Sequence, residues 1–202
     1  MNTRERILNI LHYKDIDQMP AVHFGYWPEL LLEWAQHGKI SYTLARGWAD
    51  GNEAERELDK IIGWDTNWFR VAGTANGLYP SFEQKVLETL PNGMQRIQSS
   101  FGLIERIMPG IASIPSEEDY LLKDRKAFDT LFRPKLKYLH ERVNTAFFKS
   151  FNETRPADLP YGIMLGSVLG DIRNMTSVIG MSYLMYDEDE ALFADIVDTY
   201  AD

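Results

Sequence analysis

The chain has 202 residues, of which 45% are hydrophobic and 25% charged, and its net charge is −9. An acidic chain repels nucleic acid and anionic membranes, so neither is expected as a partner. The sequence has no cysteine, no apolar leader and no run of about 18 apolar residues, which excludes disulfides and thiolate metal sites and favours a cytoplasmic protein.

The first residues predict a capped helix followed by a buried strand. Asn2, with Glu5 three residues later, resembles a capping box, and the helix should stop near Lys14. Residues 21–25 form a short apolar run with β-branched and aromatic side chains. Such a run is typical of a parallel strand that is buried on both faces.

The next elements repeat this alternation of helix and strand. Pro28 suits the first turn of a helix, and Gly38 suits its end. Asn52 is a second N-terminal cap, for a helix that Gly63 should end. Residues 66–71 then predict a second strand.

The middle of the chain has a different pattern. Residues 82–90, 94–99 and 103–108 have the character of successive strands, and Pro91-Asn92-Gly93 is a turn sequence. This segment predicts an antiparallel, hairpin-like insertion that lies outside the parallel sheet.

The last third returns to helices and one strand. A helix is predicted from Pro134, a third parallel strand over 161–166, and a helix over 167–179 that ends at Gly180. Asp187 is the predicted cap of a final helix. The helix from Pro134 has an apolar stripe formed by Leu136, Leu139, Val143 and Phe147. The stripe of the final helix is formed by Leu192, Ile196 and Tyr200.

These elements predict an α/β fold, specifically a partial (β/α)8 TIM-type barrel with an antiparallel hairpin insertion. The strands at 21–25 and 161–166 should be neighbours or near-neighbours in one sheet. A closed barrel takes about 250 residues, so residues 1–202 are expected to be the N-terminal part of one barrel domain. The alternative is an unusual open sheet that a partner completes.

Several segments, taken in order, resemble the uroporphyrinogen decarboxylase superfamily, which includes corrinoid-dependent methyltransferases. The hairpin at 82–108 resembles an insertion in the methyltransferase-like branch. The other segments are Thr3–Leu8, Asp15–Val22, Gly63–Thr66, Gly166–Gly170 and Tyr186–Asp189.

The resemblance implies a function that depends on the branch. Uroporphyrinogen decarboxylases have an arginine-rich segment after the first strand, whereas residues 23–29 contain no arginine. We therefore expect the methyltransferase-like branch, acting on a small substrate or a methyl-corrinoid. Zinc and a corrinoid would then be held by the family's C-terminal half, and no metal ligands are expected within this chain. The alternatives are uroporphyrinogen decarboxylase itself, a non-catalytic ligand-binding remnant and, more remotely, a glycosidase-like barrel.

Candidate site residues follow the predicted strands, because barrel enzymes place their chemistry at the carboxyl ends of the strands. His23 is a candidate catalytic residue, as a ligand contact or proton donor, and Tyr26 and Trp27 are candidate walls of a substrate pocket. Each could equally be a structural residue of the barrel rim. Asp65 precedes the second strand and could equally be a helix-terminal residue that faces solvent. It is a catalytic candidate through the family resemblance, in which a nearby aspartate contacts substrate.

Three further candidates follow the third predicted strand. Ser167, Asp171 and Arg173 could bind an anionic group of a small-molecule substrate at the start of a helix. The alternative is a surface pair between Asp171 and Arg173. An open strand edge and an uncovered apolar stripe on the last helix also predict self-association.

Overall fold

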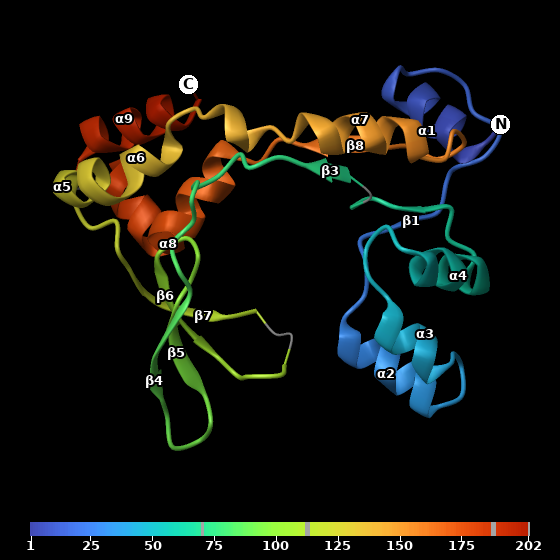
Figure 1. Cartoon of the computed structure of the whole chain (residues 1–202), viewed down its shortest axis with the longest axis horizontal. Helices are drawn as coiled ribbons and strands as arrows, with labels where there is room; N and C mark the ends of the chain where they lie inside the picture. Colours follow the sequence, from blue (N-terminus) through green and yellow to red (C-terminus); the bar gives the residue numbers. More distant parts are fainter. Residues whose placement is uncertain (70, 112–113, 187–188, 202) are drawn as a thin grey trace. The chain divides into compact units, whose positions relative to one another are not determined.

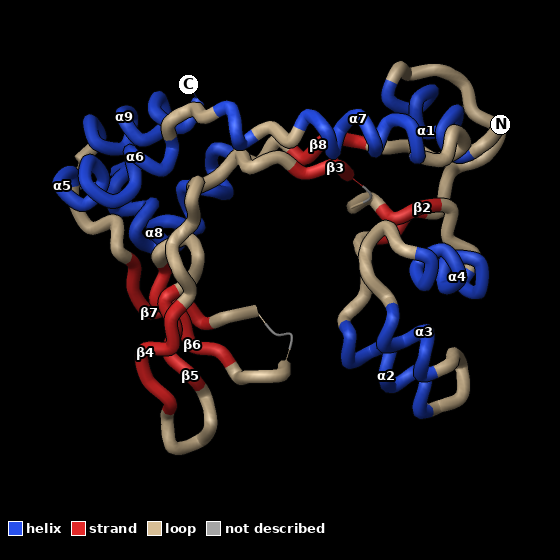
Figure 2. The backbone as a smooth tube through the Cα atoms, in the orientation of Figure 1, coloured by secondary structure: helices blue, strands red, loops and turns tan. Residues whose placement is uncertain are grey.

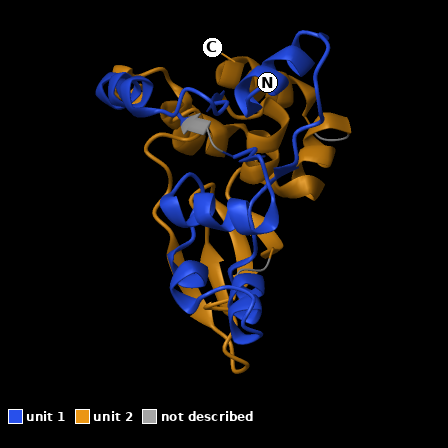
Figure 3. Cartoon of the chain, turned by 90° about the vertical axis from the view of Figure 1, so that its right-hand side faces the viewer, with its two compact units in different colours: residues 1–73, 144–164 blue, residues 74–143, 165–202 orange. Residues whose placement is uncertain are grey.

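The computed structural model describes residues 1–69, 71–111, 114–186 and 189–201, with the backbone alone for residues 71 and 72. These residues fall into two compact units, which Figure 3 distinguishes by colour. The first contains Met1–Gly73 and Asn144–Met164, and the second contains Thr74–Val143 and Leu165–Asp202.

The first unit combines helices with short parallel strands (Figures 1 and 2). Its core lies among α2, α3 and α4, where Leu31 and Leu58 are almost completely buried. The predicted caps are confirmed, since Asn2 and Glu5 form a capping box and Asn52 accepts a hydrogen bond from the Glu55 amide. The elements are α1 (Thr3–Leu11), β1 (Val22–His23), α2 (Pro28–Gln36), α3 (Tyr42–Gly47), α4 (Glu53–Ile62), β2 (Thr66–Asn67), β3 (Val71–Gly73), α7 (Thr145–Thr154) and β8 (Gly162–Met164).

The parallel strands pair two by two. Val22 pairs with Thr66 in β1 and β2, and Val71 pairs with Gly162 in β3 and β8. The prediction that the first and third strands share one sheet, buried on both faces, is therefore wrong. They lie in separate two-stranded sheets and β8 is exposed, because β1 and β8 pair with different parts of the intervening strand segment. No closed barrel is present among the described residues.

The second unit has three layers. A four-stranded antiparallel sheet contacts α8, and α8 also contacts α9 (Figure 1). The core between them includes Phe128, Phe132 and Ile172, all fully buried. The elements are β4 (Lys85–Thr89), β5 (Gln95–Gln98), β6 (Leu103–Ile107), β7 (Ser116–Tyr120), α5 (Arg125–Ala127), a π-helical turn (Phe128–Phe132), α6 (Arg133–Leu136), a 3-10 turn (His140–Arg142), α8 (Val168–Tyr186) and α9 (Glu190–Ala201).

The antiparallel insertion predicted over 82–108 is confirmed as a separate sheet, and β7 adds a strand that was not predicted. The β4–β5 turn has Pro91 and Asn92 before Gly93, whose φ is +83°. The Gly93 amide donates to the Leu90 carbonyl, as in a type I turn completed by a left-handed glycine.

The continuous helix predicted from Pro134 is wrong. The backbone becomes extended at Lys137 and again at Leu139, so α6, a 3-10 turn and α7 replace it. Arg142 donates side-chain hydrogen bonds to the carbonyls of Ala75, Gly77, Lys135 and Lys137. The bonds to Lys135 and Lys137 occupy carbonyls that a continuous helix would use, and the chain then crosses from the second unit to the first at Asn144.

The helix predicted over 167–179 also differs. α8 spans Val168–Tyr186 as two helical segments that meet at a kink at Ser177, whose φ is +64°. Gly180 does not end the helix but packs against Tyr120, whose ring atoms would lie 2.6 Å from an added Cβ. The glycine therefore serves close packing of α8 on the sheet.

The prediction that the last helix has an uncovered stripe is wrong. Leu192 and Ile196 of α9 are buried in the core that includes α8. The predicted cap Asp187 lies outside the described residues, and Asp189 accepts a hydrogen bond from the Leu192 amide. The stripe therefore gives no support to self-association.

Candidate functional site

The carboxyl ends of β1 and β2 bring two buried polar residues side by side. The parallel register places His23 opposite Asn67, and the two residues are 6% and 2% exposed. Ligands of parallel α/β proteins bind at the carboxyl ends of strands. This pair therefore marks the candidate site.

His23 is held through both of its ring nitrogens. Its Nδ1 accepts a hydrogen bond from the Gly25 amide at 3.0 Å, and its Nε2 lies 2.9 Å from Oδ1 of Asp59. Since Nδ1 is an acceptor, the proton of the neutral ring lies on Nε2, which is close to the Asp59 carboxylate but makes no hydrogen bond to it. Neither nitrogen has a lone pair directed at a substrate. His23 in this arrangement fixes the loop and Asp59 rather than acting as a free base.

Gly25 makes this loop possible. Its φ is +95°, and an added Cβ would lie 3.1 Å from the Trp48 ring and 3.3 Å from the Asp50 carboxylate. Only glycine combines that backbone conformation with so close an approach at low cost. The loop after β1 is thereby held against the loop that precedes α4.

Asn67 joins three segments of the chain. Its amide Nδ2 donates to the carboxylates of Asp50 and Glu55, each at 2.5 Å, and its Oδ1 accepts from the Phe69 amide at 2.8 Å. The other oxygen of Glu55 accepts from the Gly51 amide at 3.0 Å. Asn67 was not among the predicted site residues; the available signal was a polar side chain inside a predicted strand.

Aromatic side chains surround this polar pair. The Tyr26 ring lies 5.0 Å from the His23 ring and within 6 Å of the rings of Trp34 and Trp48, and Trp64 lies 5.6 Å from His23. Burial, with a further contribution from the charge of Asp59, raises the pKa of Tyr26 to about 12. Its phenol is therefore protonated at neutral pH.

The other candidates in this unit lie elsewhere. Trp27 precedes α2 and is 54% exposed. Asp65 lies at the amino ends of the strands, where its Oδ2 accepts from the Ala21 amide at 2.7 Å and its own amide donates to the Ala21 carbonyl. Two residues, or about 6–7 Å of strand, separate it from the His23–Asn67 level. This position suits a role in fixing register.

The candidates after β8 belong to the second unit. Ser167 accepts from the Gly170 amide at 3.0 Å, and Asp171 accepts from the Tyr200 hydroxyl. Arg173 donates to Asn174. Asp171 and Arg173 thus have separate partners. Burial and the hydrogen bond to Asp171 raise the pKa of Tyr200, so its phenol stays protonated and donates a hydrogen bond to the carboxylate.

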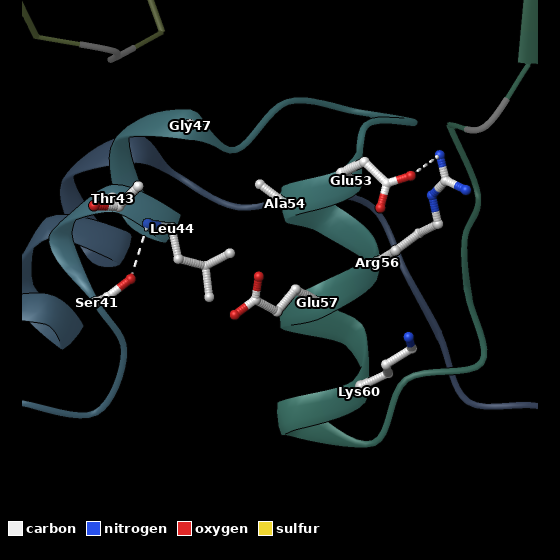
Figure 4. A pocket seen from close by; sticks show the side chains of 9 residues that line it. All are labelled: Ser41, Thr43, Leu44, Gly47, Glu53, Ala54, Arg56, Glu57 and Lys60. Atoms are coloured by element: carbon white, nitrogen blue, oxygen red, sulfur yellow. Dashed lines mark hydrogen bonds and ion pairs between the residues drawn. The ribbon is translucent and has the colours of Figure 1, made fainter.

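Two cavities lie within the first unit. The larger, about 730 Å³, is a groove between α3 and α4 (Figure 4). Glu57 points into it toward Leu44, whereas Arg56 and Lys60 point away from α3. The two cations therefore do not converge on an anion. The smaller cavity, about 350 Å³, is mostly apolar and has Asn67 in its wall.

Metal ligands do not gather in the part of the chain that the structure describes. No group of three or more His, Asp or Glu side chains there could hold a metal ion, and the sequence has no cysteine. The described residues therefore do not form a zinc site. None of the described helices combines the length and apolar character that crossing a bilayer requires.

Comparisons with known proteins gave no match to a family model, to a curated protein or to a solved structure.

Proposed function

We propose that this chain forms the first three strands of a (β/α)8 barrel of the uroporphyrinogen decarboxylase superfamily. In this proposal it belongs to the methyltransferase-like branch, which acts on a small substrate or a methyl-corrinoid. The observation that carries the proposal is the pairing order, in which β1 pairs with β2 and β8 pairs with β3, always in parallel. Strands that pair in parallel in the order of the chain, with helices between them, are the pattern of a barrel.

β8 is the point at which such a barrel would continue. Its residues are exposed, and β3 is its one partner strand among the described residues. An open parallel edge favours pairing with a further strand, from the same gene product or from a second copy. Self-association therefore stays part of the proposal on the strength of this edge alone.

The substrate end of the proposed barrel is the cluster at the carboxyl ends of β1 and β2. Tyr26 would supply a protonated hydroxyl and an apolar wall, and His23 would position the loop that carries it. Asp65, at the amino ends, would stabilise the sheet.

Zinc and a corrinoid are not assigned to these residues. The described residues include no set of side chains that could hold zinc. The absence of arginine from residues 23–29 favours the methyltransferase-like branch over a porphyrinogen decarboxylase, because a substrate with many carboxylates needs cationic partners. A non-catalytic ligand-binding protein is the remaining alternative.

The test compares two reactions. The chain and any longer in-frame product of its gene would be assayed, with zinc added, for consumption of methylcobalamin in the presence of a thiol. Uroporphyrinogen would be assayed separately for release of carbon dioxide. We expect methylcobalamin consumption by a product that includes the zinc ligands, and no carbon dioxide above background. Carbon dioxide release would support the decarboxylase, and a folded product without either activity would support the binding protein.

A pair of variants locates the site in an active product. His23→Gln should lower kcat/KM at least tenfold, because the loop after β1 loses its anchor to Asp59. Asp65→Asn should retain most of the activity, because Asp65 lies at the opposite ends of the strands. Equal losses of activity in the two folded variants would contradict this placement.

A further inference from the structure

One face of α1 combines a cation with apolar side chains. Arg4, Ile7, Leu8 and Leu11 recur at helical spacing, and all four line the 350 Å³ cavity. Leu8 and Leu11 are 38% and 60% exposed, so this face is only partly covered. Arg4 therefore lies at one end of a largely apolar face of α1.

The opposite wall of the cavity comes from the strands of the same unit. It is formed by β2 with Trp68 and Phe69, and by residues 160–164. The exposed surface of the cavity is mainly apolar. A volume of 300–1,000 Å³ with apolar walls and few polar groups is typical of small-molecule sites.

Arg4 has no charged partner within the described residues. Its side chain makes no hydrogen bond or ion pair there, although the chain as a whole carries a net charge of −9. Arg6, two residues later on the other side of α1, donates to Asp17 at 2.7 Å. Asp17 thus neutralises the charge of Arg6, whereas Arg4 lines the cavity without a charged partner among the described residues.

We propose that this cavity binds a small carboxylic acid with an apolar chain or ring. The carboxylate accepts hydrogen bonds from the Arg4 guanidinium, whose paired N–H groups match the two oxygens. The apolar body contacts Ile7 and Leu8 of α1 and the rings of Trp68 and Phe69. This inference goes beyond the proposed barrel chemistry, because it uses no cofactor and no proton transfer, although Asn67 of the candidate site also lines the cavity.

The test uses 4-phenylbutyrate and its neutral analogue 4-phenylbutyramide as probes, with affinities measured by titration calorimetry on the full chain. The acid should bind about tenfold more tightly than the amide, because one charge-assisted contact is added at a partly exposed site. Arg4→Met should abolish that preference while leaving the affinity for the amide unchanged. Retained binding of the amide shows that the variant is folded.

Lys14→Met is the matched control, because it removes one exposed positive charge near α1 without altering the cavity lining. It should leave the preference for the acid unchanged. Equal affinity for the two probes in the natural chain, or no binding of either, would overturn the proposal. So would a dimer in sedimentation that Leu8→Asp dissociates and 4-phenylbutyrate does not, because a second copy would then occupy the cavity.

Discussion

Asn67→Asp tests whether one amide holds the acidic side of the candidate site together. The substitution keeps the shape of the side chain but replaces the NH2 donor with an oxygen. Two hydrogen bonds to carboxylates, from Nδ2 to Asp50 and to Glu55, are lost, and a third carboxyl group is placed beside them in a residue that is 2% exposed. Breaking such a buried, charged arrangement costs about 3–5 kcal/mol.

The cost should depend on pH in a defined direction. The introduced carboxyl faces two carboxylates, which raises its pKa in the folded state above the unfolded value of about 4. Its protonated form can donate a hydrogen bond again, so the deficit relative to the natural chain is smallest below about pH 4. The deficit grows as the pH rises through the raised folded pKa.

Urea unfolding followed by tryptophan fluorescence measures this effect in the first unit alone. All the tryptophans of the chain lie in that unit, at positions 27, 34, 48, 64 and 68. Asn144→Asp is the matched control, because Asn144 only accepts a hydrogen bond, from the Phe147 amide, as the N-terminal cap of α7. The control should change stability by less than about 0.5 kcal/mol. Equal stabilities of Asn67→Asp and the natural chain at pH 7 would refute the reasoning.

Three further predictions use other contacts. His23→Phe should cost about 1–3 kcal/mol in the same fluorescence assay, because it leaves the buried Gly25 amide without its acceptor, and an unchanged midpoint would contradict this. Gly180→Ala should destabilise the second unit by about 1–3 kcal/mol in circular dichroism melts through overlap with Tyr120, whereas Gly77→Ala, with its nearest contact at 3.7 Å, should not. Arg133 and Arg125 hold the pKa of Asp195 at about 2, so the stability they contribute is present above about pH 4 and is lost as the pH falls toward 2. Asp195→Asn should flatten that acid dependence, and an unaltered acid transition would contradict the assignment.

The sequence by itself determined the features that depend on a few neighbouring residues. The capping box of Asn2 and Glu5, the cap at Asn52 and the left-handed Gly63 at the end of α4 all follow from local hydrogen bonding and backbone preference. The turn before Gly93 identified the antiparallel insertion for the same reason. The alternation of strands and helices gave the α/β class.

Only the tertiary structure decided the features that depend on distant partners. Arg142 interrupts the helix predicted from Pro134 because it binds carbonyls as far away as Ala75, and no local pattern encodes that contact. Gly180 resembles a helix end in the sequence but is a packing residue, since Tyr120 comes from another element.

The candidate site likewise combines features that the sequence indicated with contacts that only the tertiary structure revealed. The position of His23 at the end of a predicted strand was visible in the sequence, but its contacts with Asp59 and Gly25 were not. Asn67 was not predicted as a site residue, because its role depends on hydrogen bonds to Asp50 and Glu55, which come from a loop and a helix. A buried polar group is stabilised by its particular partners, and the three-dimensional path of the chain is what brings those partners within hydrogen-bonding distance.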